Sequence, residues 1–205
     1  MVPIYKGGSK FSAANYRPVN LTLTIMKVME SIVKDEMMGH LERNKLIKGT
    51  QHGFRPGMST VTNLIEFWSQ VIDWVDEGFP VDIFFYDFAK AFDKVEHRRL
   101  LAMVKSVGIE GDLLEWIAQW LTGRKQRVVE EGEYAEWTNV LSSVVQGSVL
   151  GPLLFVIFID DIDDDSKVLC SKFADDTKQA KVVRSQEEAE EFQEEERRME
   201  AWVGK

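Results

Sequence analysis

The segment KVLCSKFADDTKQAKVV, residues 167–183, carries the most informative pattern in this chain. Residues 167–173 and 177–183 are short runs of strand-compatible residues, so we predict two strands. The pair Asp175-Asp176 lies between them, in what we predict to be a tight turn. The two strands would form a hairpin whose tip presents two neighbouring carboxylates.

A second segment, VDIFFY at residues 81–86, predicts a short buried strand that delivers Asp87 at its carboxyl end. Two strands of one sheet could bring Asp87 together with Asp175 and Asp176. Three clustered carboxylates repel one another unless cations neutralise them, and hard oxygen ligands select Mg²⁺ or Mn²⁺. Two such ions about 3.5–4 Å apart can clamp the attacking and leaving oxygens of a phosphoryl transfer.

The aspartate turn also has a simpler explanation. Aspartate is common in turns because its side chain bonds to nearby backbone N–H groups. The turn by itself therefore does not distinguish a metal site from ordinary turn chemistry, and the rest of the sequence has to decide.

The remaining elements follow from periodicity, glycines and prolines. Residues 1–20 look irregular, and residues 151–159 form an apolar run that favours a buried helix. Ser185 and Glu188 form a capping-box signature for a final acidic helix. We further predict a helix from near Ile25 that ends before Lys45, a loop over 47–59, an amphipathic helix from Thr60 to Gly78 with Val61, Leu64, Ile65, Trp68, Ile72 and Val75 on one face, helices over 97–106 and 111–121, and a hairpin from Arg127 to Val140 that turns near Glu131-Gly132.

Composition limits the class of protein. The 205 residues correspond to one or one and a half domains, and 44% apolar with 29% charged residues suits a globular core. One cysteine, Cys170, excludes an internal disulfide framework and suits a reducing intracellular compartment, nuclear or cytoplasmic. No apolar run reaches about 18 residues, and MVPIYKGGSK lacks a signal-peptide core, so we expect no membrane partner.

The net charge of -9 at first argues against a nucleic-acid partner. However, residues 160–165 and 185–205 each carry a net charge of -5, which leaves +1 for the rest of the chain. The acidity is therefore local. The run DDIDDD at 160–165 could be a second surface that attracts metal ions, but we expect a solvated loop, because aspartate is mostly exposed.

Five segments, in order, give the chain a wider context: VPIYKGG with NYRPVNLT, QHGFRPGMST, YDFAKAFDKVEH, VVQGSVLGPLLF and KFADDTK. Together they resemble the reverse transcriptase domain of non-LTR (LINE-type) retrotransposons, in particular the jockey-like and chicken-repeat-like lineages. The resemblance implies an α+β fold, the fingers and palm of a right-hand polymerase, with a small antiparallel palm sheet backed by helices. It places a fingers-like region at 1–80, the palm at 81–184 and an acidic helix at 185–205, as one continuous fragment that stops before the thumb.

The resemblance also implies catalytic roles. Asp87 matches the first catalytic aspartate, and Asp175 and Asp176 match its partners, which together would hold two Mg²⁺ ions, with Mn²⁺ as a substitute. The backbone carbonyl of Phe88 would be a further metal ligand. Phe92 matches the aromatic gate that excludes a 2′-hydroxyl, a role compatible with a core position.

Substrate-binding roles follow in the same way. Lys6 and Arg17 match the residues that hold the triphosphate, and an ammonium and a guanidinium suit a polyanion. Gln146 matches a nucleotide contact and Gly147 a close approach to the template. Arg55, with Lys48 upstream, would meet template phosphate. Arg124, Lys125 and Arg127 form either a nucleic-acid contact or a solvated turn.

One turn departs from the family pattern. The family reads Gly-Val-Pro-Gln-Gly before the palm helix, whereas residues 143–147 read Ser-Val-Val-Gln-Gly, without the proline that fixes the backbone. Ser143 also adopts a positive φ less readily than glycine.

The implied function is RNA-directed DNA synthesis, with an RNA template, a DNA primer and deoxynucleotides as partners. The alternative is a non-catalytic remnant that binds RNA or protein, for which the acidic last helix would suit a protein partner. The sequence does not indicate an oligomeric state.

Overall fold

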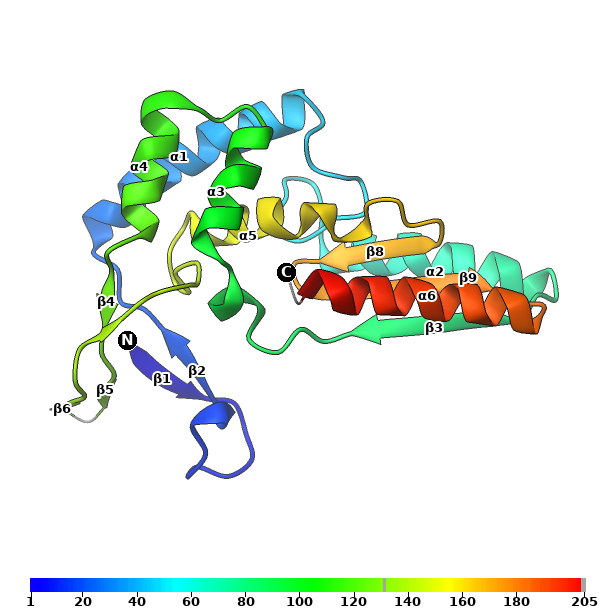
Figure 1. The fold of residues 1–205 in the computed structure, drawn as a ribbon, viewed down its shortest axis with the longest axis horizontal. Coiled ribbons are helices and arrows are strands. Elements are labelled where there is room, and N and C mark those ends of the chain that lie inside the picture. Colours follow the sequence, from blue (N-terminus) through cyan, green and yellow to red (C-terminus); the bar gives the residue numbers. More distant parts are fainter. Residues whose placement is uncertain (131, 204–205) are drawn as a thin grey trace. The chain divides into compact units, whose positions relative to one another are not determined.

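The computed structural model describes residues 1–130 and 132–203. It divides into two compact units, each built from two stretches of chain (Figure 1). Unit 1 comprises Met1–Leu46 and Lys90–Phe158, and unit 2 comprises Ile47–Ala89 and Ile159–Lys205. These divisions differ from the expected polymerase boundaries at residues 80 and 184. The expected boundaries separate the fingers from the palm, whereas the two units are defined by compactness. The fingers and palm boundaries therefore stay a prediction.

Unit 2 is built on a three-stranded antiparallel sheet in the order β3 (Val81–Tyr86), β9 (Asp176–Val182) and β8 (Leu169–Phe173). The register pairs Tyr86 with Thr177 in one ladder and Phe173 with Asp176 in the other. The predicted hairpin and the strand at 81–86 are therefore confirmed, and they form one sheet. The prediction that the strand at 81–86 is buried is wrong, because β3 lies at the edge of the sheet and Phe85 is 68% exposed.

Two helices cover opposite faces of this sheet (Figure 1). The helix α2 (Thr60–Asp76) places Phe67 and Val71 on Ala180, with Ile83 packed against the same cluster. The helix α6 (Gln186–Val203) covers the other face, where the rings of Phe192 and Phe84 lie 4.4 Å apart. Because successive strand residues point to opposite faces, Ile83 and Phe84 define the two sides of the sheet.

The buried face of α2 differs from the apolar face that the sequence predicts. Val61 and Ile72 are 61% and 53% exposed, and Leu64, Ile65, Trp68 and Val75 are exposed as well. The sheet instead covers Asn63, Phe67 and Val71. The cause is that α2 is apolar on more than one side, so periodicity alone does not identify the side that meets the sheet.

Unit 1 is mainly helical. Its buried residues come from several elements and include Leu41, Leu100, Val104, Ile117 and Leu154. Its elements are β1 (Val2–Tyr5), η1 (Ala13–Asn15), β2 (Tyr16–Val19), α1 (Thr24–Arg43), η2 (Ala91–Lys94), α3 (His97–Ser106), α4 (Gly111–Leu121), β4 (Lys125–Gln126), β5 (Val129–Glu130), β6 (Glu133–Tyr134), β7 (Thr138–Asn139) and α5 (Gly151–Ile159). The predicted helices and the buried run at 151–159 are confirmed. Strands β5 and β6 form the expected second hairpin, while the predicted turn residue Glu131 lies outside the described residues.

The first twenty residues are not irregular throughout, which corrects the prediction. Strands β1 and β2 pair antiparallel, with Pro3 opposite Pro18. Proline lowers the strand signal in a sequence, yet an edge strand tolerates it because no neighbour requires its missing N–H. A two-stranded ribbon consists only of edge strands.

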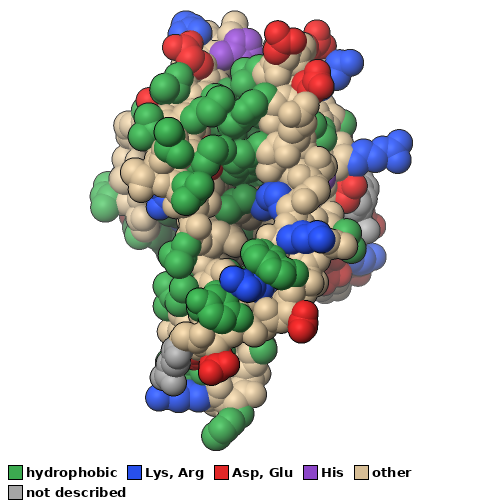
Figure 2. Space-filling view, turned by 90° about the vertical axis from the view of Figure 1, so that its left-hand side faces the viewer, with side chains coloured by type: hydrophobic (Ala, Val, Ile, Leu, Met, Phe, Trp, Pro, Cys, Tyr) green, Lys and Arg blue, Asp and Glu red, His purple; other side chains and the backbone are tan. Residues whose placement is uncertain are grey.

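Helix α1 exposes an apolar stripe. Ile25, Val28 and Ile32 are all more than half exposed, whereas Met37 and Leu41 further along the helix are buried. Figure 2 shows hydrophobic side chains gathered in the upper part of the view, the level at which α1 and α4 lie in Figure 1. Within residues 1–130 and 132–203, no helix is both long and apolar enough to cross a membrane.

Candidate active site

Three aspartates lie near one end of the sheet in unit 2. Asp175 occupies the tight turn between β8 and β9, and Asp176 begins β9. Since Tyr86 pairs with Thr177, the next residue, Asp87, lies level with Asp176 in the antiparallel register. Directly opposite residues project to the same face of a sheet, so Asp87 and Asp176 share a side. Both residues are exposed, and Asp175 is half-buried.

The chemistry of this group suits a hard divalent cation, because all three side chains offer carboxylate oxygens. Among the described residues, however, no three His, Cys, Asp or Glu side chains already converge into a metal-binding group. The backbone brings the three positions to one edge, and closing the carboxylates around an ion is a further step.

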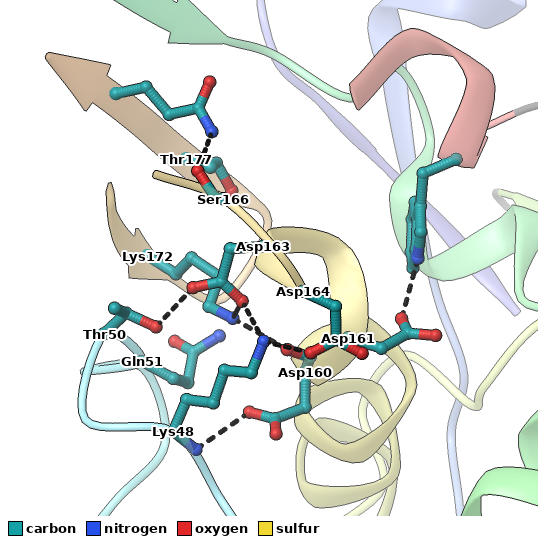
Figure 3. Close-up of polar contacts among 12 residues, drawn as sticks. Lys48, Thr50, Gln51, Asp160, Asp161, Asp163, Asp164, Ser166, Lys172 and Thr177 are labelled. Atoms are coloured by element: carbon teal, nitrogen blue, oxygen red, sulfur yellow. Dashed lines mark hydrogen bonds and ion pairs between the residues drawn. The ribbon is translucent and has the colours of Figure 1, made fainter. Parts of the chain in front are cut away.

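The run at 160–165 was predicted to be a solvated loop, and this is wrong for its first four residues. Asp164 and Asp165 do form an exposed turn. Residues 160–163 form a short helical turn, η3 (Asp160–Asp163), and the side chain of Asp163 is only 4% exposed. Figure 3 shows its carboxylate between two lysines: it accepts hydrogen bonds from Lys172 Nζ at 2.6 Å and Lys48 Nζ at 2.9 Å, and from Thr50 Oγ1 at 2.7 Å.

Electrostatics explain why Asp163 tolerates this position. Burial alone would raise its pKa, but Lys172, Lys48 and the Thr50 hydroxyl together hold the pKa below its usual range. Burial also lowers the pKa of Lys48, but Asp164 and Asp163 outweigh it and raise the value. The carboxylate is thus charged and matched by cations inside the fold.

The neighbours of Asp163 are held too. Asp160 Oδ1 accepts the backbone N–H of Lys48 at 3.1 Å, and Asp161 Oδ1 accepts the indole N–H of Trp202 at 2.7 Å (Figure 3). The sequence does carry a signal for the buried aspartates. They follow the apolar run directly, with no Gly or Pro to end the helix, so the helical path continues into them.

The predicted template contacts in this unit have local partners. Arg55 Nη1 donates to the carbonyls of Lys48 and Gln51, at 2.8 and 3.1 Å. Arg55 therefore shapes the loop over 47–59 in this structure, and Lys48 belongs to the Asp163 cluster. A contact from Arg55 to template phosphate stays a prediction.

In unit 1, the predicted triphosphate residues line one cavity. Lys6, Arg17 and Gln146 border a space of about 440 Å³, although about 130 residues of sequence separate the last two. Lys10 and Lys90 line the same cavity and were not predicted. Four cations around one opening make it suited to a polyanion.

Asp93 also lines this cavity. Burial raises the pKa of its carboxyl, while Lys90 and Lys6 act in the opposite direction. Asp93 therefore offsets part of the positive charge of the cavity.

Phe92 is half-buried and stacks on Phe155, with ring centroids 4.1 Å apart and planes 12° from parallel. Its backbone carbonyl accepts the N–H of Val144 at 3.1 Å, which ties η2 to the 143–147 turn. Phe92 thus packs in the core, a position that is compatible with its expected role as the aromatic gate that excludes a 2′-hydroxyl. In unit 2, the Phe88 ring stacks with Tyr86, and metal ligation by the Phe88 carbonyl stays a prediction.

The turn at residues 143–147 requires its glycine for a reason within the chain. Gly147 has a φ of +96°, and a Cβ there would lie 2.7 Å from the carbonyl oxygen of Asn20. The Asn20 backbone N–H donates to the Gln146 carbonyl at 2.9 Å. Close backbone packing against Asn20 therefore accounts for Gly147, whether or not a template also approaches.

Ser143 adopts a φ of +99° despite its side chain. Its carbonyl lies 2.9 Å from His97 Nε2 and accepts a bond from Arg124 Nη2 at 2.7 Å. Arg124 is therefore not a solvated turn residue, and burial lowers its pKa. Arg127 lies over the rings of Tyr134 and Trp137.

Comparison with known proteins gives this arrangement a family. Residues 4–203 match the family described as reverse transcriptase (RNA-dependent DNA polymerase). The chain is 30% identical over 168 residues to a probable RNA-directed DNA polymerase from transposon X-element of Drosophila melanogaster, covering 80% of this chain and 18% of that protein. The jockey element polymerase of Drosophila funebris is 27% identical over 205 residues, covering 94% and 22%.

The fold has solved counterparts. Telomerase from Candida tropicalis, in complex with a TWJ fragment of telomeric RNA, superposes with a TM-score of 0.60 at 11% identity, covering 88% of this chain and 32% of that one. An apo form truncated from the C-terminal domain gives 0.58 at 12% identity, covering 83% and 36%. These likenesses support the α+β polymerase fold.

The chain belongs to the reverse transcriptase family. Its transposon relatives confirm the resemblance to the reverse transcriptase domain of non-LTR retrotransposons. The chain spans about a fifth of the length of the curated relatives that it matches.

Proposed function

We propose that this chain carries the nucleotidyl-transfer site of an RNA-directed DNA polymerase. The observation that supports it most is the strand register that brings Asp87 level with Asp176, beside Asp175. In the proposed reaction, a primer 3′-hydroxyl attacks the α-phosphate of a deoxynucleotide on an RNA template. Pyrophosphate leaves as the new phosphodiester bond forms.

Asp87, Asp175 and Asp176, with the Phe88 carbonyl, would hold two Mg²⁺ ions, or Mn²⁺ in their place. When bound, these ions would lower the charge on the transferring phosphate and align its oxygens. All three side chains are carboxylates, whose oxygen atoms are the ligands that hard divalent cations prefer.

The unit 1 residues would bind the nucleotide. Lys6 and Arg17 would neutralise the triphosphate, and Gln146 would contact the nucleotide from the same cavity. Phe92 is held by Phe155, so its ring would present a fixed wall to the sugar and exclude a 2′-hydroxyl. Gly147 and Arg55 would lie along the template.

A primer-extension assay on an RNA template with Mg²⁺ tests the proposal. Wild-type chain should extend the primer, and Asp175→Asn should abolish extension because it removes a charged metal ligand. Asp82→Asn is the matched control, because Asp82 is an exposed aspartate of the same sheet on β3. Equal extension by the wild type and Asp175→Asn would refute this site, and RNA binding without Mg²⁺ dependence or extension would favour a non-catalytic module.

A further inference from the structure

The turn that carries Asp175 depends on a residue far away in the sequence. Ala174 is 5% exposed and has a φ of +56°, a conformation that residues with a Cβ rarely adopt. Such a conformation persists only where the surrounding structure fixes it. The contacts of Ala174 therefore indicate what holds the turn.

Those contacts come from the side chain of Gln51, which is fully buried. Its Oε1 accepts the backbone N–H of Ala174 at 2.9 Å, and its Nε2 donates to the Ala174 carbonyl at 3.3 Å. The same Oε1 accepts the N–H of Gly53 at 2.8 Å. One amide thus satisfies both backbone polar groups of the turn residue that precedes Asp175.

Gly53 shows how closely the loop approaches the turn. A Cβ at this position would lie 2.3 Å from the backbone nitrogen of Ala174. The obstructing atom belongs to the main chain, so rotation of a side chain could not relieve the clash. The glycine of the QHG sequence at 51–53 therefore leaves room for the turn.

Gln51 is itself held on both sides. The Lys172 N–H donates to the Thr50 carbonyl at 2.7 Å, and the His52 N–H donates to the Lys172 carbonyl at 2.9 Å, so the loop runs beside β8 as a parallel bridge. Asp163 then joins the side chains of Thr50 and Lys172 (Figure 3). The buried carboxylate, the loop and the turn form one continuous polar framework.

We propose that Gln51 is a positioning residue for the metal-binding turn, with Asp163 as the anchor of its loop. Gln51 fixes the backbone of Ala174 and thereby the directions in which Asp175 and Asp176 project. The inference rests on the proposed function for its catalytic consequence, whereas the positioning itself can be measured on the chain without substrate.

The test compares Gln51→Met, which keeps the length and loses all three hydrogen bonds of the side chain, with Gln51→Glu, which keeps the acceptor and loses the donor. Gln70→Met and Gln70→Glu are the matched controls, because Gln70 is exposed on α2 in the same unit. The first readout is the set of amide chemical shifts of residues 173–177. The second is the affinity for Mn²⁺ alone, measured by calorimetry.

Gln51→Met should move the turn shifts and weaken Mn²⁺ binding by roughly 10- to 100-fold, the usual effect of losing a group that orients metal ligands. Gln51→Glu should also move the turn shifts at neutral pH, because its carboxylate cannot donate to the Ala174 carbonyl. It should regain wild-type shifts as the pH falls, because the protonated carboxyl can again donate to the Ala174 carbonyl. The Gln70 variants should match the wild type at each pH.

Wild-type shifts and Mn²⁺ affinity in Gln51→Met would overturn the inference. If that variant does not fold, a pH-independent Gln51→Glu spectrum would overturn it instead. If neither variant folds, rapid exchange of the Ala174 amide in the wild type would do so, because a bonded buried amide exchanges slowly. These readouts involve no polymerisation, so a wild type that positions its turn but extends no primer would refute the proposed function alone.

Discussion

Unit 2 contains two groups of aspartates that lie in different surroundings. The run at 160–165 has the higher charge density, yet its Asp163 lies buried between Lys48 and Lys172. Asp87 and Asp176 are exposed at the end of the sheet. The difference teaches that the number of carboxylates in a segment does not indicate a metal site. What matters is whether the fold already supplies the cations.

Removing the buried carboxylate should give the largest effect. Asp163→Asn leaves Lys172, whose side chain is 0% exposed, without its charge partner. We expect a loss of about 3–5 kcal/mol in the free energy of unfolding, as for other broken buried pairs. Urea denaturation measures it. Asp176→Asn should change stability by less than about 0.5 kcal/mol; equal losses for both variants would remove the distinction between the two groups.

Gly53→Ala should have the second largest effect, because Gly53 lies where the loop over 47–59 meets the turn at Ala174. The added methyl would displace the Ala174 backbone, and overpacking of this kind costs about 1–3 kcal/mol. Thermal unfolding gives the stability and amide shifts of residues 173–177 report the turn. Gly49→Ala is the control, since a Cβ there meets nothing within 4 Å. The same small effect for both would show that the loop does not press on the turn.

Acid should weaken the buried group in a defined direction. The pKa of Asp163 is lowered in the folded chain, so its contribution to stability is present above the unfolded value and is lost as the pH falls through the folded value. The difference in unfolding free energy between wild type and Asp163→Asn should be constant above about pH 5 and shrink below about pH 4. A difference that grows on acidification would contradict this sign.

Asp164→Asn should give the smallest effect. Asp164 also contacts Lys48, but its side chain is 61% exposed, so solvent screens the pair. Exposed ion pairs contribute about 0–1 kcal/mol. A loss as large as that of Asp163→Asn would mean that charge, rather than burial, sets the importance of each residue in the run. The comparison uses the same denaturation assay.

The local elements could be predicted from sequence. The strand at 81–86, the helices at 97–106 and 111–121, and the buried run at 151–159 follow from propensity and punctuation over a few residues. The β1 and β2 hairpin could not, because its prolines mask the signal. The prediction of which side of α2 is buried was also wrong. When a helix has two apolar sides, the buried side can be identified only once the packing partner is known.

The candidate site shows the same division. The aspartates and the cavity residues Lys6, Arg17 and Gln146 were found from family motifs, which mark chemistry without giving its surroundings. Gln51 belongs to one of those motifs but received no role. Its partner, Ala174, is 123 positions away, and no local pattern reports a hydrogen bond across that distance.

The sequence by itself determined the main helices, the strands of the sheet in unit 2, the family and the acidic residues proposed for metal binding. Only the tertiary structure decided which of those acids are exposed and which are matched internally. The physical reason is that propensity depends on neighbours along the chain, whereas the energy of a charge depends on burial and on cations supplied by distant segments. Lys48, Lys172 and Asp163 illustrate this, since they come from the loop over 47–59, from β8 and from η3.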